Sequence, residues 1–199
     1  MKGKNLKYNN EKIILVDCDG VLLDWMYAFD LWLEERGYKR DADNSDYDRA
    51  VVYKTSSEKM QELIRHFNSS AAIGFLPPLR DSIYYVRKMF IEHGYVFHAI
   101  TSLSKDRHAQ ALRTENLKML FGKRTFEKFV YLDTDEDKTE ALTPYKDSGC
   151  YWIEDKIHNA RVGRSLGLES ILIGADHNMT DEFPRYWKWK DVYKHITKS

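Results

Sequence analysis

Acidic side chains follow two separate apolar runs of this sequence in a pattern that suits metal-assisted chemistry. Asp17 and Asp19 come directly after one run, and Glu154 and Asp155 come directly after another. If both runs are strands of one open parallel sheet, their carboxyl ends meet at the edge where ligands bind in such sheets. Carboxylates that converge there repel one another, and burying them unpaired is costly. A divalent cation would resolve this conflict.

The types of ligand atom at these positions favour magnesium over zinc. The acids Asp17, Asp19, Glu154 and Asp155 offer only oxygen atoms, and none of these four positions is His or Cys. Hard cations such as Mg²⁺ prefer oxygen ligands, and Mg²⁺ commonly shares its coordination shell with a substrate phosphate. The pattern therefore predicts phosphoryl chemistry with Mg²⁺ as the cofactor.

The short segment Asp17–Gly20 has a spacing that suits two different catalytic roles. In an extended segment, residues two apart lie on one side, so the carboxylates of Asp17 and Asp19 face the same space. One carboxylate can attack phosphorus while the other handles the proton. Gly20 permits a backbone conformation that other residues rarely adopt. A calcium-binding loop is excluded, because no ladder of Asp or Asn ligands and no closing Glu follows.

Alternating strand and helix patterns position these acids. The predicted strands are residues 13–16, 95–100, 129–132, 151–153 and 170–173. The predicted helices of the same region are residues 82–92, 106–121, 138–145 and 159–166. Such alternation predicts an α/β fold, a Rossmann-like and mostly parallel sheet with helices on both faces.

Residues 22–74 carry no strand signal and contain two helical patterns, at 25–38 and 57–67. We therefore predict a small helical insertion after the first strand, with residues 1–21 and 75–199 forming the α/β core. The aromatic-rich tail, residues 183–196, is predicted to form a final helix on that core.

Composition narrows the function classes further. Of the 199 residues, 43% are hydrophobic and the formal net charge is zero, so a packed core is expected and stable nucleic-acid binding is not. No apolar run is long enough to span a membrane, and residues 1–10 do not read as a signal peptide, which favours the cytoplasm. Cys18 and Cys150 are expected to be buried reduced thiols. Whether the chain forms a homodimer stays open.

Four segments together resemble the haloacid dehalogenase superfamily. The string Asp17-Cys18-Asp19-Gly20-Val21 resembles its first motif, and Thr101-Ser102 at the end of the second strand resembles its second. Lys138 resembles the third-motif lysine, and Glu154-Asp155 resembles a paired-acid form of the fourth. The order and approximate spacing agree over residues 12–173.

Within that superfamily the sequence is most similar to the 5'(3')-deoxyribonucleotidases. The cues are Asp19-Gly20-Val21-Leu22, the segment 74–79 and Asp137-Lys138-Thr139. Glu154 departs from this subfamily, which usually has Asp there. The interval from Lys138 to Glu154 is also long, so Lys146 stays open as the alternative site lysine, with Lys138 favoured.

The resemblance implies a role for each matched position. Asp17 would attack phosphorus and become an aspartyl phosphate, and Asp19 would protonate the leaving oxygen and then activate water. The other matched residues would bind phosphate (Thr101, Ser102, Lys138), bind metal (Asp17, Asp155 and the Asp19 carbonyl) or support the metal site from outside (Glu154). The insertion would act as a cap over the site.

These inferences predict a magnesium-dependent phosphomonoesterase, most similar to a nucleotidase acting on nucleoside monophosphates. Two alternatives stay open: a phosphatase for another small phosphomonoester such as a sugar phosphate, and a catalytically silent binding module with the same fold.

Overall fold

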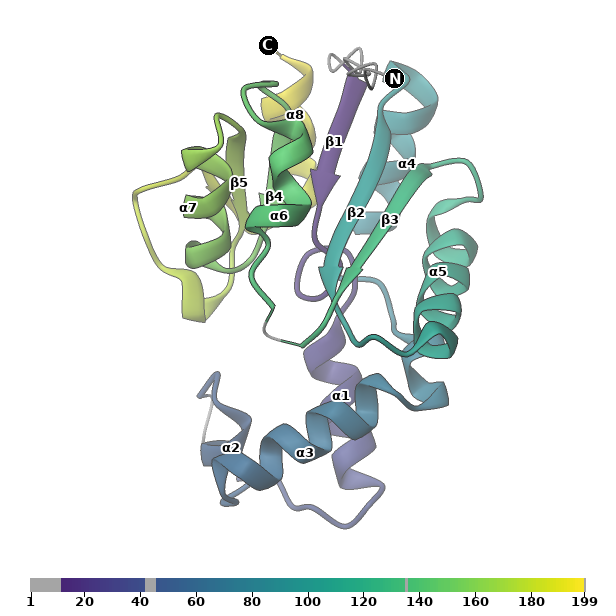
Figure 1. The fold of residues 1–199 in the computed structure, drawn as a ribbon, viewed down its shortest axis with the longest axis vertical. Coiled ribbons are helices and arrows are strands. Elements are labelled where there is room, and N and C mark those ends of the chain that lie inside the picture. The colour runs from purple at the N-terminus through teal and green to yellow at the C-terminus, as the bar shows by residue number, and fades with distance from the viewer. Residues whose placement is uncertain (1–11, 42–45, 135, 199) are drawn as a thin grey trace, which may run out of the picture.

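The computed structural model describes residues 12–41, 46–134 and 136–198. The polar segment 1–10 and part of the predicted loop after the first insertion helix lie outside the described residues. Within the described ranges, a sheet flanked by helices forms one lobe and a smaller group of helices forms another (Figure 1).

The sheet has six parallel strands in the order β3-β2-β1-β4-β5-β6. Their bounds are β1 Ile13–Val16, β2 Val96–Ser102, β3 Phe126–Leu132, β4 Tyr151–Glu154, β5 Glu169–Ile173 and β6 Arg185–Tyr186. The chain moves outward in one direction from β1 to β2 and β3, and in the other direction from β4 onward. The reversal at β1 and β4 opens a crevice at their carboxyl ends, where ligands bind in sheets of this type.

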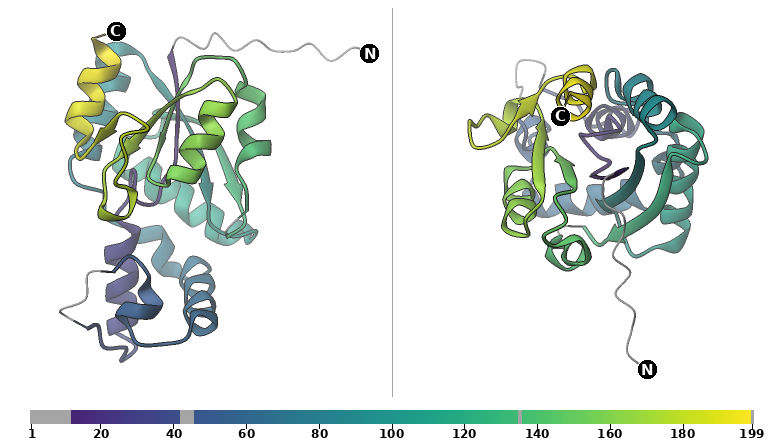
Figure 2. Two further views of the ribbon diagram at one scale, coloured as in Figure 1. Left: turned by 90° about the vertical axis from the view of Figure 1, so that its left-hand side faces the viewer. Right: turned by 90° about the horizontal axis from the view of Figure 1, so that it is seen from above.

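Helices cover both faces of the sheet (Figure 2). Their bounds are α4 Ser82–His93, α5 Arg107–Phe121, α6 Thr139–Leu142, α7 Ile157–Ser165 and α8 Trp189–Thr197. Side chains alternate along β1, so Ile14 and Val16 pack in the cluster that includes α4, α5 and α8, while Ile13 and Leu15 pack in a second cluster with Leu142 of α6. All four β1 residues are buried, as expected for a central parallel strand.

The smaller lobe contains α1 Trp25–Glu34, α2 Arg49–Val52 and α3 Ser57–Asn68. It is held together by the stacked and edge-on rings of Phe29, Trp32 and Phe67. In Figure 1 these helices lie beyond the carboxyl ends of β1 and β2. The insertion therefore sits where it can cover the crevice.

The predicted α/β fold with a parallel sheet is confirmed, and most element boundaries agree within a few residues. The first insertion helix ends at Glu34 rather than Tyr38, and the predicted 138–145 helix splits into α6 and a 3-10 turn at Thr143–Tyr145. The tail differs more, because β6 precedes α8. Cys18 and Cys150 are buried thiols, as expected. No helix among the described residues has the length and apolar character needed to cross a membrane.

Candidate active site

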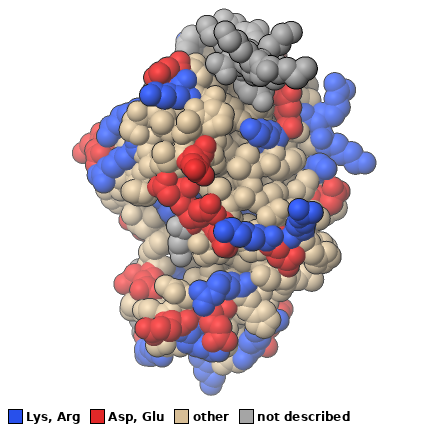
Figure 3. Space-filling model, viewed as in Figure 1, with Lys and Arg blue, Asp and Glu red and all other residues tan. Residues whose placement is uncertain are grey.

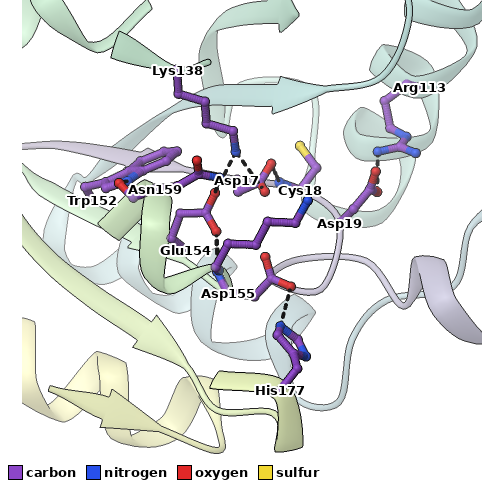
Figure 4. Close-up of polar contacts among 11 residues, drawn as sticks. Asp17, Cys18, Asp19, Arg113, Lys138, Trp152, Glu154, Asp155, Asn159 and His177 are labelled. Atoms are coloured by element: carbon purple, nitrogen blue, oxygen red, sulfur yellow. Dashed lines mark hydrogen bonds and ion pairs between the residues drawn. The ribbon is translucent and has the colours of Figure 1, made fainter. Parts of the chain in front are cut away.

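The carboxyl ends of β1 and β4 bring the predicted acidic residues together. The backbone N–H of Asp17 donates to the carbonyl of Ile153 across 2.9 Å, so the two strand ends lie side by side. Oxygens of Asp17, Glu154 and Asp155 all lie within 4.8 Å of one another, and all three side chains are buried. In Figure 4, Asp17 and Glu154 point toward Lys138, and Asp155 lies next to them on the side of His177.

Lys138 forms the centre of the buried charge network. Its ammonium Nζ lies 2.9 Å from Asp17 Oδ2 and 2.7 Å from Glu154 Oε1, and its side chain is 2% exposed. Burial disfavours the ammonium, but the two carboxylates outweigh burial and hold the pKa of Lys138 above its ordinary value. Lys146 is exposed on the surface. The tertiary structure therefore brings Lys138, and not Lys146, to the acidic residues.

Glu154 has no oxygen left without a partner. Oε1 accepts from Lys138 and, at 2.6 Å, from the Asn159 amide, while Oε2 accepts from the backbone N–H groups of Asp155 and Lys156, each at 2.6 Å. A carboxylate with all its bonding positions occupied is suited to holding its neighbours in place. The supporting role outside the metal shell stays a prediction for Glu154, and these four bonds are compatible with it.

Asp155 is the acid best placed to accept a cation. Its Oδ1 atom is buried without a hydrogen-bond partner, and Oδ2 lies 3.2 Å from His177 Nε2. Lys138 and Arg113 pair with the other acids of the site, whereas Asp155 faces His177 and the ammonium of Lys156. The buried Asp155 oxygen without a hydrogen-bond partner fits a bound divalent cation.

Gly20 permits Asp155 to approach the first strand. Its φ is +73°, and a Cβ atom added there would lie 2.5 Å from Asp155 Oδ2. A residue with a side chain would therefore strain the backbone and displace the carboxylate. The sequence indicated the special backbone conformation, but the close approach to Asp155 depends on the fold.

Asp19 lies beside the acidic cluster with a cation of its own. Arg113 of α5 donates from Nη1 to Asp19 Oδ1 across 2.6 Å. Burial raises the pKa of the Asp19 carboxyl, against the opposing pull of Arg113, and burial likewise raises the pKa of Asp17 against Lys138. A raised pKa suits a group that must carry a proton near neutral pH.

The predicted phosphate-binding pair lies at the end of β2. Thr101 is buried, with 1% of the residue exposed. Ser102 lines a cavity of about 700 Å³, and Asp17, Asp19 and Lys138 line the same cavity. Residues of the helical insertion also line this cavity, including Trp25, Tyr47, Arg49 and Arg65. The cavity is large enough for a nucleotide-sized molecule.

The sequence did not predict three residues that contact the acids of the site: Arg113, Asn159 and His177. Arg113 and Asn159 lie within helices, and nothing in their spacing marks them. His177 lies just beyond β5, so the rule that sites lie at strand carboxyl ends could have found it. Its ring also packs against Tyr47 of the insertion, with the ring centroids 4.0 Å apart and the planes tilted by 31°. The core and the insertion therefore touch next to Asp155.

Comparison with solved structures identifies proteins that share this fold. A haloacid dehalogenase-like hydrolase from Streptococcus pneumoniae is 16% identical, with a TM-score of 0.63 over 93% of this chain and 98% of that one. The fold is that of haloacid dehalogenase-like hydrolases. A hydrolase of this type from Deinococcus radiodurans, with bound phosphate and sodium, is 15% identical with a TM-score of 0.58, covering 94% of this chain and 95% of that one.

Two further similarities extend the comparison. A CbbY variant from Rhodobacter sphaeroides, in complex with xylulose-(1,5)bisphosphate, is 13% identical with a TM-score of 0.59, covering 91% of this chain and 96% of that one. In sequence, the chain is 25% identical to an uncharacterized 32.4 kDa protein in the Gp30-rIII intergenic region of enterobacteria phage T4, covering 90% of this chain and 67% of that protein. No family model matches the sequence.

The buried ion pairs of Lys138 with Asp17 and Glu154 are expected to contribute to the stability of the fold. Lys138→Met leaves Asp17 and Glu154 buried without their cation, so we expect the free energy of unfolding near pH 7 to fall by about 3–5 kcal/mol. Burial raises the folded-state pKa of Asp17 above 3.8, and removing Lys138 takes away a group that opposes this rise. The folded variant then holds protons that the unfolded chain releases, so its deficit should grow as the pH rises above that value and shrink in acid. Urea unfolding at several pH values measures this.

Lys146→Met is the matched control, because it removes a lysine that is exposed. It should leave the unfolding midpoint almost unchanged at every pH. Equal losses in the two variants would contradict the central position assigned to Lys138.

Proposed function

We propose that this protein is a magnesium-dependent phosphomonoesterase that uses Asp17 as its nucleophile and acts on nucleoside monophosphates. One observation carries the proposal: Asp17, Lys138, Glu154 and Asp155 converge, buried, at the carboxyl edge of a haloacid dehalogenase-type sheet. This edge opens into a cavity that Asp19 and Ser102 also line.

The first half of the reaction transfers the phosphoryl group to the protein. Asp17 attacks phosphorus, the bond to the leaving oxygen breaks, and Asp19 gives its proton to that oxygen. Lys138 neutralises charge on Asp17 and on the phosphoryl oxygens, while Thr101 and Ser102 hydrogen-bond to those oxygens. Asp17, Asp155 and the backbone carbonyl of Asp19 would hold Mg²⁺, which supplies positive charge to the phosphate.

The second half returns the site to its starting state. Water attacks phosphorus, its proton passes to Asp19, and the bond between phosphorus and Asp17 breaks to release phosphate. Glu154 contributes by fixing Lys138 and the backbone around Asp155. The helical insertion would cover the cavity during this cycle, because Tyr47 already contacts His177 there.

Nucleoside monophosphates are the proposed substrates because of the cavity lining. Beyond the acids, the wall carries the aromatic residues Trp25, Tyr47 and Trp187 and the cations Arg49 and Arg65. Planar bases pack on aromatic rings. Lys, Arg, Asp and Glu side chains are interspersed on the face in Figure 3 without a continuous basic stripe, which favours a small substrate over a nucleic acid.

Asp17→Asn tests the nucleophile. The amide cannot attack phosphorus, so we expect phosphate release to fall by at least about a thousandfold while the protein stays folded. Colorimetric phosphate release and circular dichroism measure the two properties. Asp147→Asn, an exposed change of the same kind, should keep full activity. Activity that survives Asp17→Asn would exclude this mechanism, and a wild-type protein without activity would favour the binding module.

The proposed Mg²⁺ dependence is tested by chelation and by two glycine variants. Chelation should abolish phosphate release and Mg²⁺ should restore it. Gly20→Ala pushes a Cβ against Asp155, so we expect the Mg²⁺ concentration for half-maximal activity to rise by about tenfold or more. Gly94→Ala has a similar backbone cost at φ +70° but meets nothing within 4 Å, so its Mg²⁺ requirement should not change. Full activity in excess chelator would refute the metal assignment.

Assays with a panel of phosphomonoesters test which class of substrate the protein prefers. With Mg²⁺ present, kcat/KM should be highest for nucleoside monophosphates among a set of mononucleotides and sugar phosphates. A preference for sugar phosphates over every nucleotide would overturn the nucleotide assignment and leave the phosphatase chemistry standing. The sugar bisphosphate bound by the similar CbbY protein makes this the relevant competitor.

A further inference from the structure

Arg113 is a fully buried cation that no pattern in the sequence marks. It lies within α5, 0% of its side chain is exposed, and its Nη1 donates to Asp19 Oδ1 across 2.6 Å. Its Nε and Nη2 atoms are buried without a hydrogen-bond partner. A buried guanidinium with one satisfied nitrogen is a costly way to stabilise a fold, because each unpaired polar atom loses its hydration.

Asp19 depends on this one side chain. Among the described residues, Arg113 is the side chain that hydrogen-bonds to Asp19, and it engages Oδ1 alone. Asp19 also lines the cavity and keeps 22% of its side chain exposed. One oxygen is thus anchored in the protein interior, and the other remains available for a proton.

The two aspartates of the first motif have separate cations. Lys138 contacts Asp17, whereas Arg113 contacts Asp19 from a different helix on the other side (Figure 4). In Figure 4 the Asp19 carboxylate points toward Arg113 and away from Lys138. This arrangement keeps the two carboxylates apart and stops Asp19 from competing with Asp17 for Lys138.

We propose that Arg113 is a positioning residue that anchors Asp19 for proton transfer to the leaving group. The inference rests on the proposed function, because it assigns Asp19 the proton-transfer step. The step itself is unchanged: the proton moves from Asp19 to the leaving oxygen as the bond between that oxygen and phosphorus breaks. Arg113 touches neither the phosphoryl group nor the leaving group, and it acts through the carboxylate that it holds.

The basicity of the leaving group supplies a readout that separates positioning from structural support. An alkoxide is a poor leaving group and needs the proton from Asp19, whereas p-nitrophenolate leaves readily without one. The ratio kcat/KM reports only the steps up to departure of the leaving group. A poorly positioned Asp19 therefore lowers kcat/KM for an alkyl phosphate far more than for p-nitrophenyl phosphate.

The experiment compares Arg113→Met with the wild-type protein on β-glycerol phosphate and p-nitrophenyl phosphate. We expect kcat/KM to fall by at least about tenfold more for the alkyl ester than for the aryl ester. Arg113→Lys, which keeps a cation near Asp19, should recover part of the loss. Arg107→Met, an exposed change at the start of the same helix, should leave both values unchanged.

A double-mutant cycle with Asp19→Asn tests whether Arg113 acts through Asp19. Adding Arg113→Met to Asp19→Asn should cause no further selective loss with the alkyl ester. Equal losses with both esters in the folded single variants would overturn the proposal and leave Arg113 a structural residue. If Arg113→Met does not fold, the same comparison is made with Arg113→Lys. Absence of phosphate release in the wild-type protein would instead overturn the proposed function.

Discussion

The candidate site depends on one interaction, the sharing of Lys138 between Asp17 and Glu154. Two carboxylates lie within hydrogen-bond distance of one ammonium, and all three side chains are almost fully buried. Removing the cation would leave two buried negative charges side by side. Glu154 is fixed further by Asn159 and two backbone N–H groups, so the lysine has little freedom. The position of the proposed nucleophile therefore depends on residues of β4, α7 and the start of α6.

The sheet topology makes this interaction possible. The 134 residues 17–150 separate β1 from β4 in the sequence, yet the two strands pair in register with Val16 opposite Ile153. Their carboxyl ends therefore deliver Asp17 and the pair Glu154 and Asp155 to the same place. The insertion that follows β1 lies over this place, and its Tyr47 reaches His177. The fold thus brings acids and an aromatic wall around one cavity.

Charge is distributed unevenly within the site. Asp17 and Glu154 share Lys138, Asp19 is paired with Arg113, and Asp155 has one buried oxygen without a partner. The paired acids can keep fixed positions, whereas the Asp155 oxygen without a hydrogen-bond partner is able to accept a further positive charge. This asymmetry gives a physical basis for the different roles that we propose for Asp17, Asp19 and Asp155.

The sequence by itself determined the α/β class and the main strands. Buried parallel strands require continuous apolar runs, whereas helices require apolar residues that recur at helical spacing. It also placed Asp17, Asp19, Glu154 and Asp155 at strand ends, since strand boundaries are local features. Only the tertiary structure chose Lys138 over Lys146 as the residue beside Asp17. It alone brought Arg113 to Asp19 and His177 to Asp155. These pairs join residues far apart in the chain, and their contact depends on how helices pack on the sheet, which local patterns do not encode.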